Sequence, residues 1–340
     1  MHKANRLLIA ALALIGTSAA LAQSSVTLYG RVNTTVERQK DGNATKTGLF
    51  NNASRWGIRG TEDLGGGLKA GFALESGFAS DTGAGTGWPG LTSVGNGINF
   101  GRQSEVNLSG GFGMVRLGNF VPESYYATAD YVSMHNHDTG SSSDALYYDP
   151  VWFGGLGTKN KVGYRTPSMG GLTVDAAVLL HEKAAGTNNK NGYDLAANYN
   201  MGPLHLGAGY SYANSNYQAA LRALYTFGQF TVGGYYQRNK DANQMNAGLG
   251  AGTRNNYRLS GMYTLGASEF HANIGRADSW SKLSSSAATQ WTLGYNYNLS
   301  KRTKAYGYYT RVNNGNSANY NVSAAGTDFS SFAVGIRHNF

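Results

Sequence analysis

Strict alternation of apolar and polar side chains is the feature that most constrains how this chain folds. In the stretch "SRWGIRG", which begins at Ser54, Trp56 and Ile58 alternate with arginine and glycine. Successive side chains of a β-strand point to opposite faces of the sheet, so a period of two predicts strands. Sixteen segments read this way: 26–37, 54–63, 68–78, 98–109, 114–120, 161–166, 172–181, 192–200, 204–213, 217–226, 230–238, 253–264, 269–279, 289–299, 303–313 and 330–340.

The connections between these segments alternate between short and long. Short turns are expected at 64–67, 110–113, 167–171, 200–203, 227–229, 265–268 and 299–302. Longer polar loops are expected at 38–53, 79–97, 121–160, 182–191, 239–252, 280–288 and 314–329. Short turns at one rim and long loops at the other are typical of outer-membrane barrels, whose tilted strands need about 9–11 residues. We therefore predict one all-β domain, a 16-stranded antiparallel transmembrane β-barrel.

The N-terminus predicts export from the cytoplasm. A basic start with Lys3 and Arg6 is followed by an apolar run, Leu7–Ile15, and by the small-x-small site Ala20-Leu21-Ala22. These are the three parts of a secretory signal peptide, and the apolar run is shorter than a spanning helix. We expect a signal peptide over 1–22 and a barrel over 23–340. Cleavage lowers the formal charge from +9 to 9 − 2 = +7.

Composition agrees with a barrel better than with a disulfide-stabilised exported protein. The chain has no cysteine, 48 glycines and 23 tyrosines. Its mean hydropathy of −0.36 is that of a soluble protein, but a barrel averages its lipid-facing and lumen-facing residues to a similar value. In lipid a sheet must close to satisfy its backbone, and sixteen strands enclose water rather than a packed core. The apolar face of each strand is therefore predicted to face lipid.

Three stretches carry a family resemblance. They are "QSSVTLYGRV" (Gln23–Val32), "SRWGIRGTEDLGGGLKAGF" (Ser54–Phe72), and the C-terminal "FAVGIRHNF", which ends at Phe340. Together they resemble the trimeric general porins of Gram-negative outer membranes, in the branch typical of Burkholderia, Delftia, Bordetella and Neisseria relatives. The resemblance covers essentially the whole mature chain.

This resemblance implies a homotrimer that passively conducts ions and small hydrophilic solutes, without a cofactor. It implies a third long loop that folds into the lumen and narrows it, with selectivity set by the field between wall cations and loop acids. Its surroundings would be outer-membrane lipid and lipopolysaccharide. The C-terminal Phe340 resembles the signal that the barrel assembly machinery reads.

Two arginines are the first candidates for the basic wall of a pore constriction. Arg31 and Arg55 match wall cations of the family, and both point to the lumen by alternation with apolar neighbours. Arg59 shares the face of Arg55 but stands nearer the glycine turn, so it is either a constriction residue or a solvated charge below it.

Arg102 matches a third wall cation, but its parity conflicts with that role. It shares the phase of Val106 and Leu108, which would turn it toward lipid at a cost of about 2–4 kcal/mol. A bulge or a strand end would remove the conflict. A further family arginine corresponds to Gly157, so Lys159 or Lys161 supplies that charge instead.

Loop three, 121–160, is expected to supply the acidic side of the constriction. Asp130 is the first candidate and Glu123 the second; the loop also holds Asp138, Asp144 and Asp149. The net positive mature chain predicts a preference for anions.

Other classes of function are less compatible with the sequence than a channel is. The motif "HNHD" (His135–Asp138) offers two histidines to a metal, but tetrahedral zinc needs further ligands, and polar loop histidines are favoured. An outer-membrane enzyme of the protease or phospholipase type, a substrate-specific channel and a soluble all-β binding protein are the alternatives. Sequence spacing identifies no catalytic set, so no enzyme is predicted, and no Lys/Arg cluster suggests nucleic acid.

Overall fold

The computed structural model describes residues 25–86, 99–130, 132, 140–153, 159–182, 190–242 and 252–340. The predicted signal peptide, 1–22, and the histidines of "HNHD" lie outside these residues. The strands are β1 (Ser25–Asp41), β2 (Ala44–Asn51), β3 (Arg55–Gly65), β4 (Leu68–Phe78), β5 (Gly85–Thr86), β6 (Gln103–Gly110), β7 (Gly113–Asn119), β8 (Lys161–Arg165), β9 (Leu172–Leu179), β10 (Gly192–Met201), β11 (Leu204–Ala213), β12 (Asn216–Phe227), β13 (Phe230–Asp241), β14 (Gly252–Leu265), β15 (Ser268–Ala277), β16 (Ala288–Asn298), β17 (Thr303–Asn314) and β18 (Phe329–Asn339).

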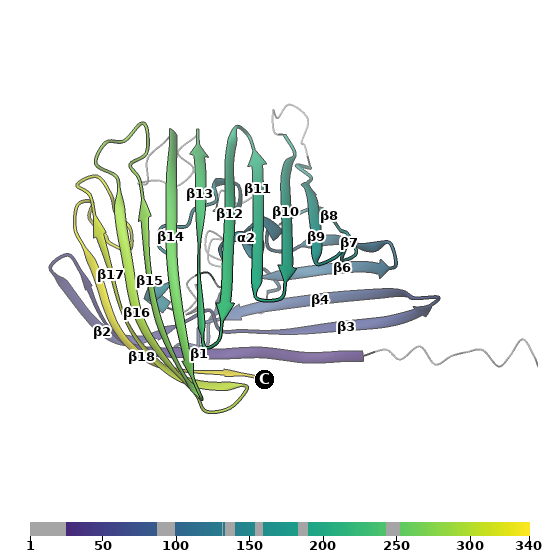
Figure 1. Ribbon diagram of the computed structural model, residues 1–340, viewed down its shortest axis with the longest axis horizontal. Helices are drawn as coiled ribbons and strands as arrows, with labels where there is room; N and C mark the ends of the chain where they lie inside the picture. The colour runs from purple at the N-terminus through teal and green to yellow at the C-terminus, as the bar shows by residue number, and fades with distance from the viewer. Residues whose placement is uncertain are drawn as a thin grey trace, which may run out of the picture.

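These strands form a closed antiparallel barrel with sixteen wall positions (Figure 1). β2 and β3 together fill one position, because β2 pairs with the second half of β1 and β3 with its first half. The two-residue β5 pairs only with the end of β4. The wall closes where β1 pairs with β18, and there the N–H groups of Gly30 and Phe340 each donate to the other's carbonyl at 3.0 Å.

One predicted loop and one predicted strand boundary are wrong. The segment 38–53 was expected to be a long loop, but β1 runs to Asp41 and β2 returns from Ala44, so this rim carries a tight hairpin. Gly42 makes the turn possible with a φ of +56°. The segment 98–109 was expected to be strand throughout, but β6 begins only at Gln103.

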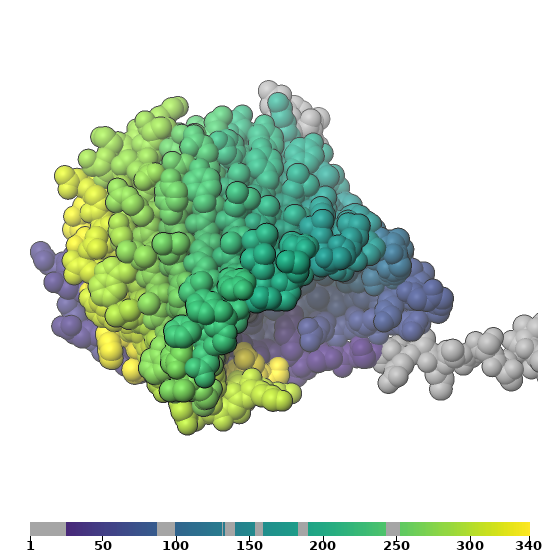
Figure 2. Space-filling model, in the orientation of Figure 1, coloured from purple at the N-terminus to yellow at the C-terminus, as the bar shows by residue number. Residues whose placement is uncertain are grey.

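The two faces of the wall are divided as the alternation predicts. Large apolar side chains cover the outside, with exposed fractions such as 61% for Leu28 and 58% for Phe332. Asn33, Thr35 and Glu37, at the intervening positions of β1, are buried inside the barrel. Figure 2 shows the outer face of the later strands as a continuous wall, hollowed at its lower edge, where N-terminal residues are seen deeper.

The connections are sorted between the two rims with exceptions. The short turns after β10 and β12 lie at the lower edge in Figure 1. Besides the β1–β2 hairpin, the β11–β12 turn at the opposite rim also has two residues, Asn214 and Ser215, with φ of 49° and 72°. Among the described residues, no helix is long and apolar enough to span a bilayer.

Loop 3, residues 120–160 between β7 and β8, folds into the barrel. Its described parts include α2 (Glu123–Thr128), the 3-10 turn η1 (Gly140–Ser142) and α3 (Pro150–Phe153). α2 packs against β10, β11 and β12, α3 against β11, β12 and β13, and η1 against β17. The described parts of loop 3 therefore line the inner wall from β10 to β17 and reach Glu37 in the second half of β1, and they leave the first half of β1 and the wall of β3 to β6 facing the lumen.

Candidate pore constriction

Two arginines stand directly opposite each other on the lumen face of neighbouring strands. Arg31 on β1 is the register partner of Arg55 on β3. Directly opposed residues on one face of an antiparallel pair have Cβ atoms about 4.5–5.5 Å apart, and like charges there are destabilising. Arg31 Nη2 donates to the Ala53 carbonyl at 3.5 Å, in the break between β2 and β3. The fold thus holds two positive charges together at an energetic cost.

Arg102 joins this group through Glu75. Its Nε lies 2.6 Å from Glu75 Oε1, and the same oxygen lies 3.8 Å from Arg55 Nε. Arg102 precedes β6, so the alternation that pointed it toward lipid does not apply to it. It is buried and lines the lumen, which resolves the predicted conflict in favour of a strand end.

The other two basic candidates stand apart from this group. Arg59 lies four residues after Arg55 on β3, toward the periplasmic turn, and its side chain is exposed. Its guanidinium carbon lies over the Tyr29 ring, 5.1 Å from the ring centroid. Lys159 is exposed at the end of loop 3, next to Asn160, whose carbonyl accepts from Leu180 N at the extracellular end of β9. Lys161 is buried, with its Nζ 3.2 Å from the Phe120 carbonyl and 3.7 Å from Asp194 Oδ2.

α2 is seated on the barrel wall by a carboxylate and two glycines. Asp194 on β10 accepts from the backbone N–H groups of Glu123 and Ser124, the first two residues of the helix. Gly207 and Gly209 face the lumen on β11, and a side chain at either would overlap the backbone of α2. This close approach is why the inner face of β11 is small at these positions.

The two acidic candidates are both on or near α2 but have different partners. Glu123 pairs with Arg116 on β7 and, at 2.8 Å, with Arg165 on β8, so it ties the start of loop 3 to that wall. Asp130 follows the helix, and its Oδ1 accepts from the Tyr125 hydroxyl at 3.2 Å.

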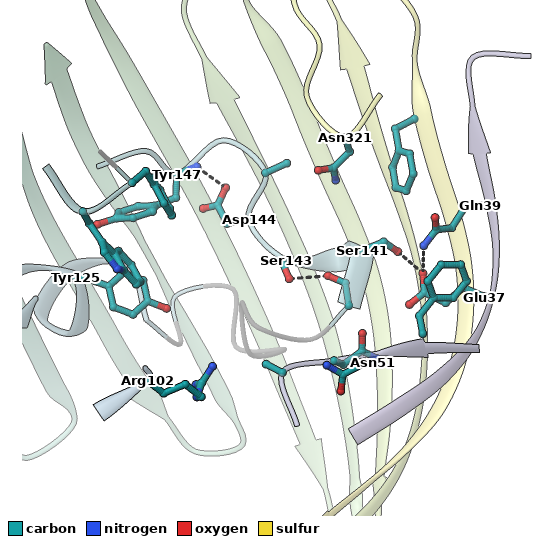
Figure 3. Close-up of a pocket in the computed structure, with 18 residues that line it drawn as sticks. Glu37, Gln39, Asn51, Arg102, Tyr125, Ser141, Ser143, Asp144, Tyr147 and Asn321 are labelled. Carbon is teal, nitrogen blue, oxygen red and sulfur yellow. Dashed lines mark hydrogen bonds between the residues drawn. The ribbon is translucent and has the colours of Figure 1, made fainter. Parts of the chain in front are cut away.

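The second half of loop 3 is held by three buried carboxylates. Asp144 pairs with Arg258 on β14 at 2.6 Å, and Asp149 accepts from Ser211 on β11 at 2.9 Å. Glu37 on β1 accepts from Ser141 at 2.7 Å, as Figure 3 shows, and it also binds four wall side chains, which are Thr35, Gln39, Tyr308 and Ser331. The space between this segment and the wall has a volume of about 550 Å³, and it reaches from Glu37 to Arg102.

Two of these loop carboxyls have shifted pKa values in opposite directions. Burial disfavours the charge of Asp144, but Arg258 and the Tyr235 hydroxyl outweigh it and hold the pKa of Asp144 below its usual value. Burial raises the pKa of Asp149 to about 6, against hydrogen bonds from Trp152 N and Ser211 Oγ. Asp144 is therefore a charged anchor, whereas Asp149 is close to its titration midpoint near neutral pH.

Several of these residues were not predicted from the sequence. Alternation alone puts Glu75 on the inward face of β4, but its link to two arginines depends on the register of β3, β4 and the segment before β6. The seat of α2 on Gly207 and Gly209 depends on loop packing. No group of three or more His, Asp or Glu suited to a metal occurs among the described residues.

Comparison with known proteins gives a consistent assignment. The chain matches the Gram-negative porin family over residues 8–317. Outer membrane porin protein 32 of Delftia acidovorans is 33% identical, over 98% of this chain and 99% of its own. The solved anion-selective porin from Comamonas acidovorans superposes with a TM-score of 0.74 at 30% identity, over 94% and 100% of the two chains.

A more distant likeness concerns the fold alone. The trimer form of OmpT, an outer membrane protein of Vibrio cholerae, has a TM-score of 0.65 at 15% identity, over 93% and 99% of the two chains. This chain belongs to the Gram-negative porin family, and its barrel is a passive diffusion channel of the outer membrane.

Proposed function

We propose that this channel prefers anions and that Arg31, Arg55 and Arg102 form its selectivity filter. The observation that carries the proposal is the register pairing of Arg31 with Arg55 on the lumen face. A like-charge pair that weakens the wall is expected to persist where its charge has a use. The anion selectivity of the Comamonas porin, 30% identical to this chain, supports the same preference.

The arginine group acts on passing ions by electrostatics alone. A unit charge in water contributes about 1 kcal/mol at about 4 Å, and more beside a low-dielectric wall. Because Glu75 contacts two of the three guanidinium groups, it weakens the field of the group without cancelling it. Arg59 then attracts anions at the periplasmic side, while Asp130 supplies negative charge on the loop side. The charge of Glu123, the second acidic candidate, is largely offset by Arg116 and Arg165. The resulting field raises the local concentration of anions.

Charge removal tests the filter. Arg31→Ala and Arg55→Ala should each move the reversal potential under a salt gradient toward cations, with a roughly twofold to fivefold fall in the anion-to-cation permeability ratio. Arg38→Ala is the matched control, because Arg38 is exposed on the outward face of β1, the strand that also carries Arg31. Unchanged reversal potentials in both lumen variants would refute the filter.

We also propose that the protein assembles as a homotrimer in lipid and lipopolysaccharide, that Phe340 is read by the barrel assembly machinery, and that the channel has no enzymatic activity. The apolar outer face of β1, with Val26 and Leu28 largely exposed, supports a surface covered by lipid or by another subunit. Chemical cross-linking of intact outer membranes tests the trimer, since ladders that stop at two would contradict it. Lipase and protease assays on the purified barrel test the last point.

A further inference from the structure

Arg222 lies on the lumen face across the barrel from the arginine group. It belongs to β12, and its neighbour Leu221 is 61% exposed on the outer face. Following the paired strands, β12 is eight wall positions from β3 in either direction, so it is diametrically opposite the strand that carries Arg55. This is the side of the barrel that loop 3 covers.

The guanidinium of Arg222 binds backbone oxygens of loop 3. Its Nη1 donates to the carbonyls of Tyr126 at 3.2 Å and Asp130 at 3.4 Å, and Nη2 donates to Asn198 Oδ1 at 3.4 Å. Gly207 leaves room for it, since a Cβ there would lie 3.3 Å from Nε. Arg222 has no ion-pair contact with a carboxylate anywhere in the described part of the chain, in contrast to Arg116, Arg165 and Arg258, which do.

The segment that Arg222 holds faces the opposite wall. Tyr126 is 41% exposed, and the neighbouring Tyr125 lines the same cavity as Arg102 of the arginine group (Figure 3). The charge of Asp130 also acts on Arg222 itself. Asp130, the first candidate for the acidic side of the constriction, therefore has a cation behind it.

We propose that Arg222 is a further specificity-determining residue, which offsets the negative charge of Asp130, so that the loop-3 side of the constriction is close to neutral instead of negative. This inference deepens the proposed anion preference and rests on it. The field across the pore is then weaker than a basic wall facing an uncompensated acidic loop would produce. Anions therefore meet net positive charge on the arginine wall and little opposing negative charge on the loop side.

Three variants separate the charge of Arg222 from its role in holding the loop. Arg222→Gln removes the charge and keeps a hydrogen-bond donor. Arg222→Lys keeps the charge but loses the planar guanidinium group, whose two terminal nitrogens donate to different acceptors. In planar bilayers under a salt gradient, the Gln variant should show about a fourfold fall in the anion-to-cation permeability ratio, because one charge about 10 Å from the ion path in water changes anion entry and cation entry about twofold each, in opposite directions. The Lys variant should keep the wild-type ratio. Arg238→Gln is the matched control, because it removes the same charge from the exposed outer face of β13.

The outcomes that overturn the inference are distinct from those that overturn the proposed function. An unmoved reversal potential in Arg222→Gln, or equal shifts in the Gln and Lys variants, would leave Arg222 with a positioning role only. If the Gln variant does not assemble, Arg222→His should become more anion-preferring between about pH 8 and about pH 5, relative to wild type; no such change would also overturn it. A wild-type channel without anion preference would refute the proposed function, yet the Gln variant would still move toward cations if Arg222 acts as inferred.

Discussion

Replacing Gly209 by alanine should loosen loop 3 from the barrel wall. A Cβ at this position would lie 2.6 Å from the Ser124 carbonyl oxygen and 2.9 Å from Ser124 Cα. To restore an ordinary contact, the backbone of α2 has to retreat from β11 by about 0.4–0.8 Å. Overpacking of this kind typically costs about 1–3 kcal/mol. A loss of about 2 kcal/mol would raise the ratio of released to docked loop about thirtyfold.

A matched substitution isolates this contact from the general effect of removing a glycine. Gly261→Ala on β14 adds a methyl group that contacts nothing within 4 Å. Like Gly209→Ala, it should stabilise its strand by about 0.5–1 kcal/mol, because alanine loses less conformational entropy than glycine on folding. Single-channel recordings should show brief current fluctuations that are more frequent in Gly209→Ala than in Gly261→Ala. Gly207→Ala should show the most, because its added methyl would overlap the Ala127 carbonyl. Indistinguishable recordings from all three would refute the glycine seat.

Two further predictions concern a loop anchor and the closing seam. The pKa of about 6 for Asp149 exceeds its ordinary value of 3.8, so the docked loop holds this proton more tightly than the released loop does. Docking of loop 3 should therefore weaken by roughly 3 kcal/mol as the pH rises from about 4 to about 6. Asp149→Asn should make the current noise of the channel independent of pH in that range. Noise that still depends on pH in this variant would contradict the prediction. Phe340→Ala should lower the fraction of chain that migrates as the compact, heat-modifiable form, while Phe340→Tyr should not, because the ring covers Gly30 at the seam; equal yields would argue against it.

The strands, and the face of the sheet to which each side chain points, were predictable because both depend on residues that are close together in the sequence. Arg31 and Arg55 were assigned to the lumen from alternation alone, and their register confirms that they share one face. The strand Ala44–Asn51 was missed because "ATKTGLFN" has no large apolar residue before Leu49, so its period is weak near the rim. Arg102 was ambiguous since parity has meaning only inside a strand, and β6 begins one residue later.

The contacts on the loop-3 side of the constriction could not be predicted from short-range patterns in the sequence. The contacts of Arg222 with Tyr126 and Asp130 join positions about ninety residues apart, and they exist only because loop 3 folds inward. Nothing in the period of β12 distinguishes Arg222 from a solvated lumen charge. Loop packing depends on shape complementarity between distant segments, which a single sequence does not encode in any repeating pattern.

The pairing of Arg31 with Arg55 has a consequence for engineering and for evolution. Neutralising Arg31 relieves its repulsion with Arg55, whereas neutralising Arg55 also removes the contact with Glu75. A change at Arg31 should therefore make the barrel more heat-resistant while it weakens discrimination between ions, and a screen that rewards thermal tolerance alone would enrich substitutions at this position. Selection for ion discrimination has to oppose that drift continuously, and the wall retains a weakness that the rest of the barrel does not need.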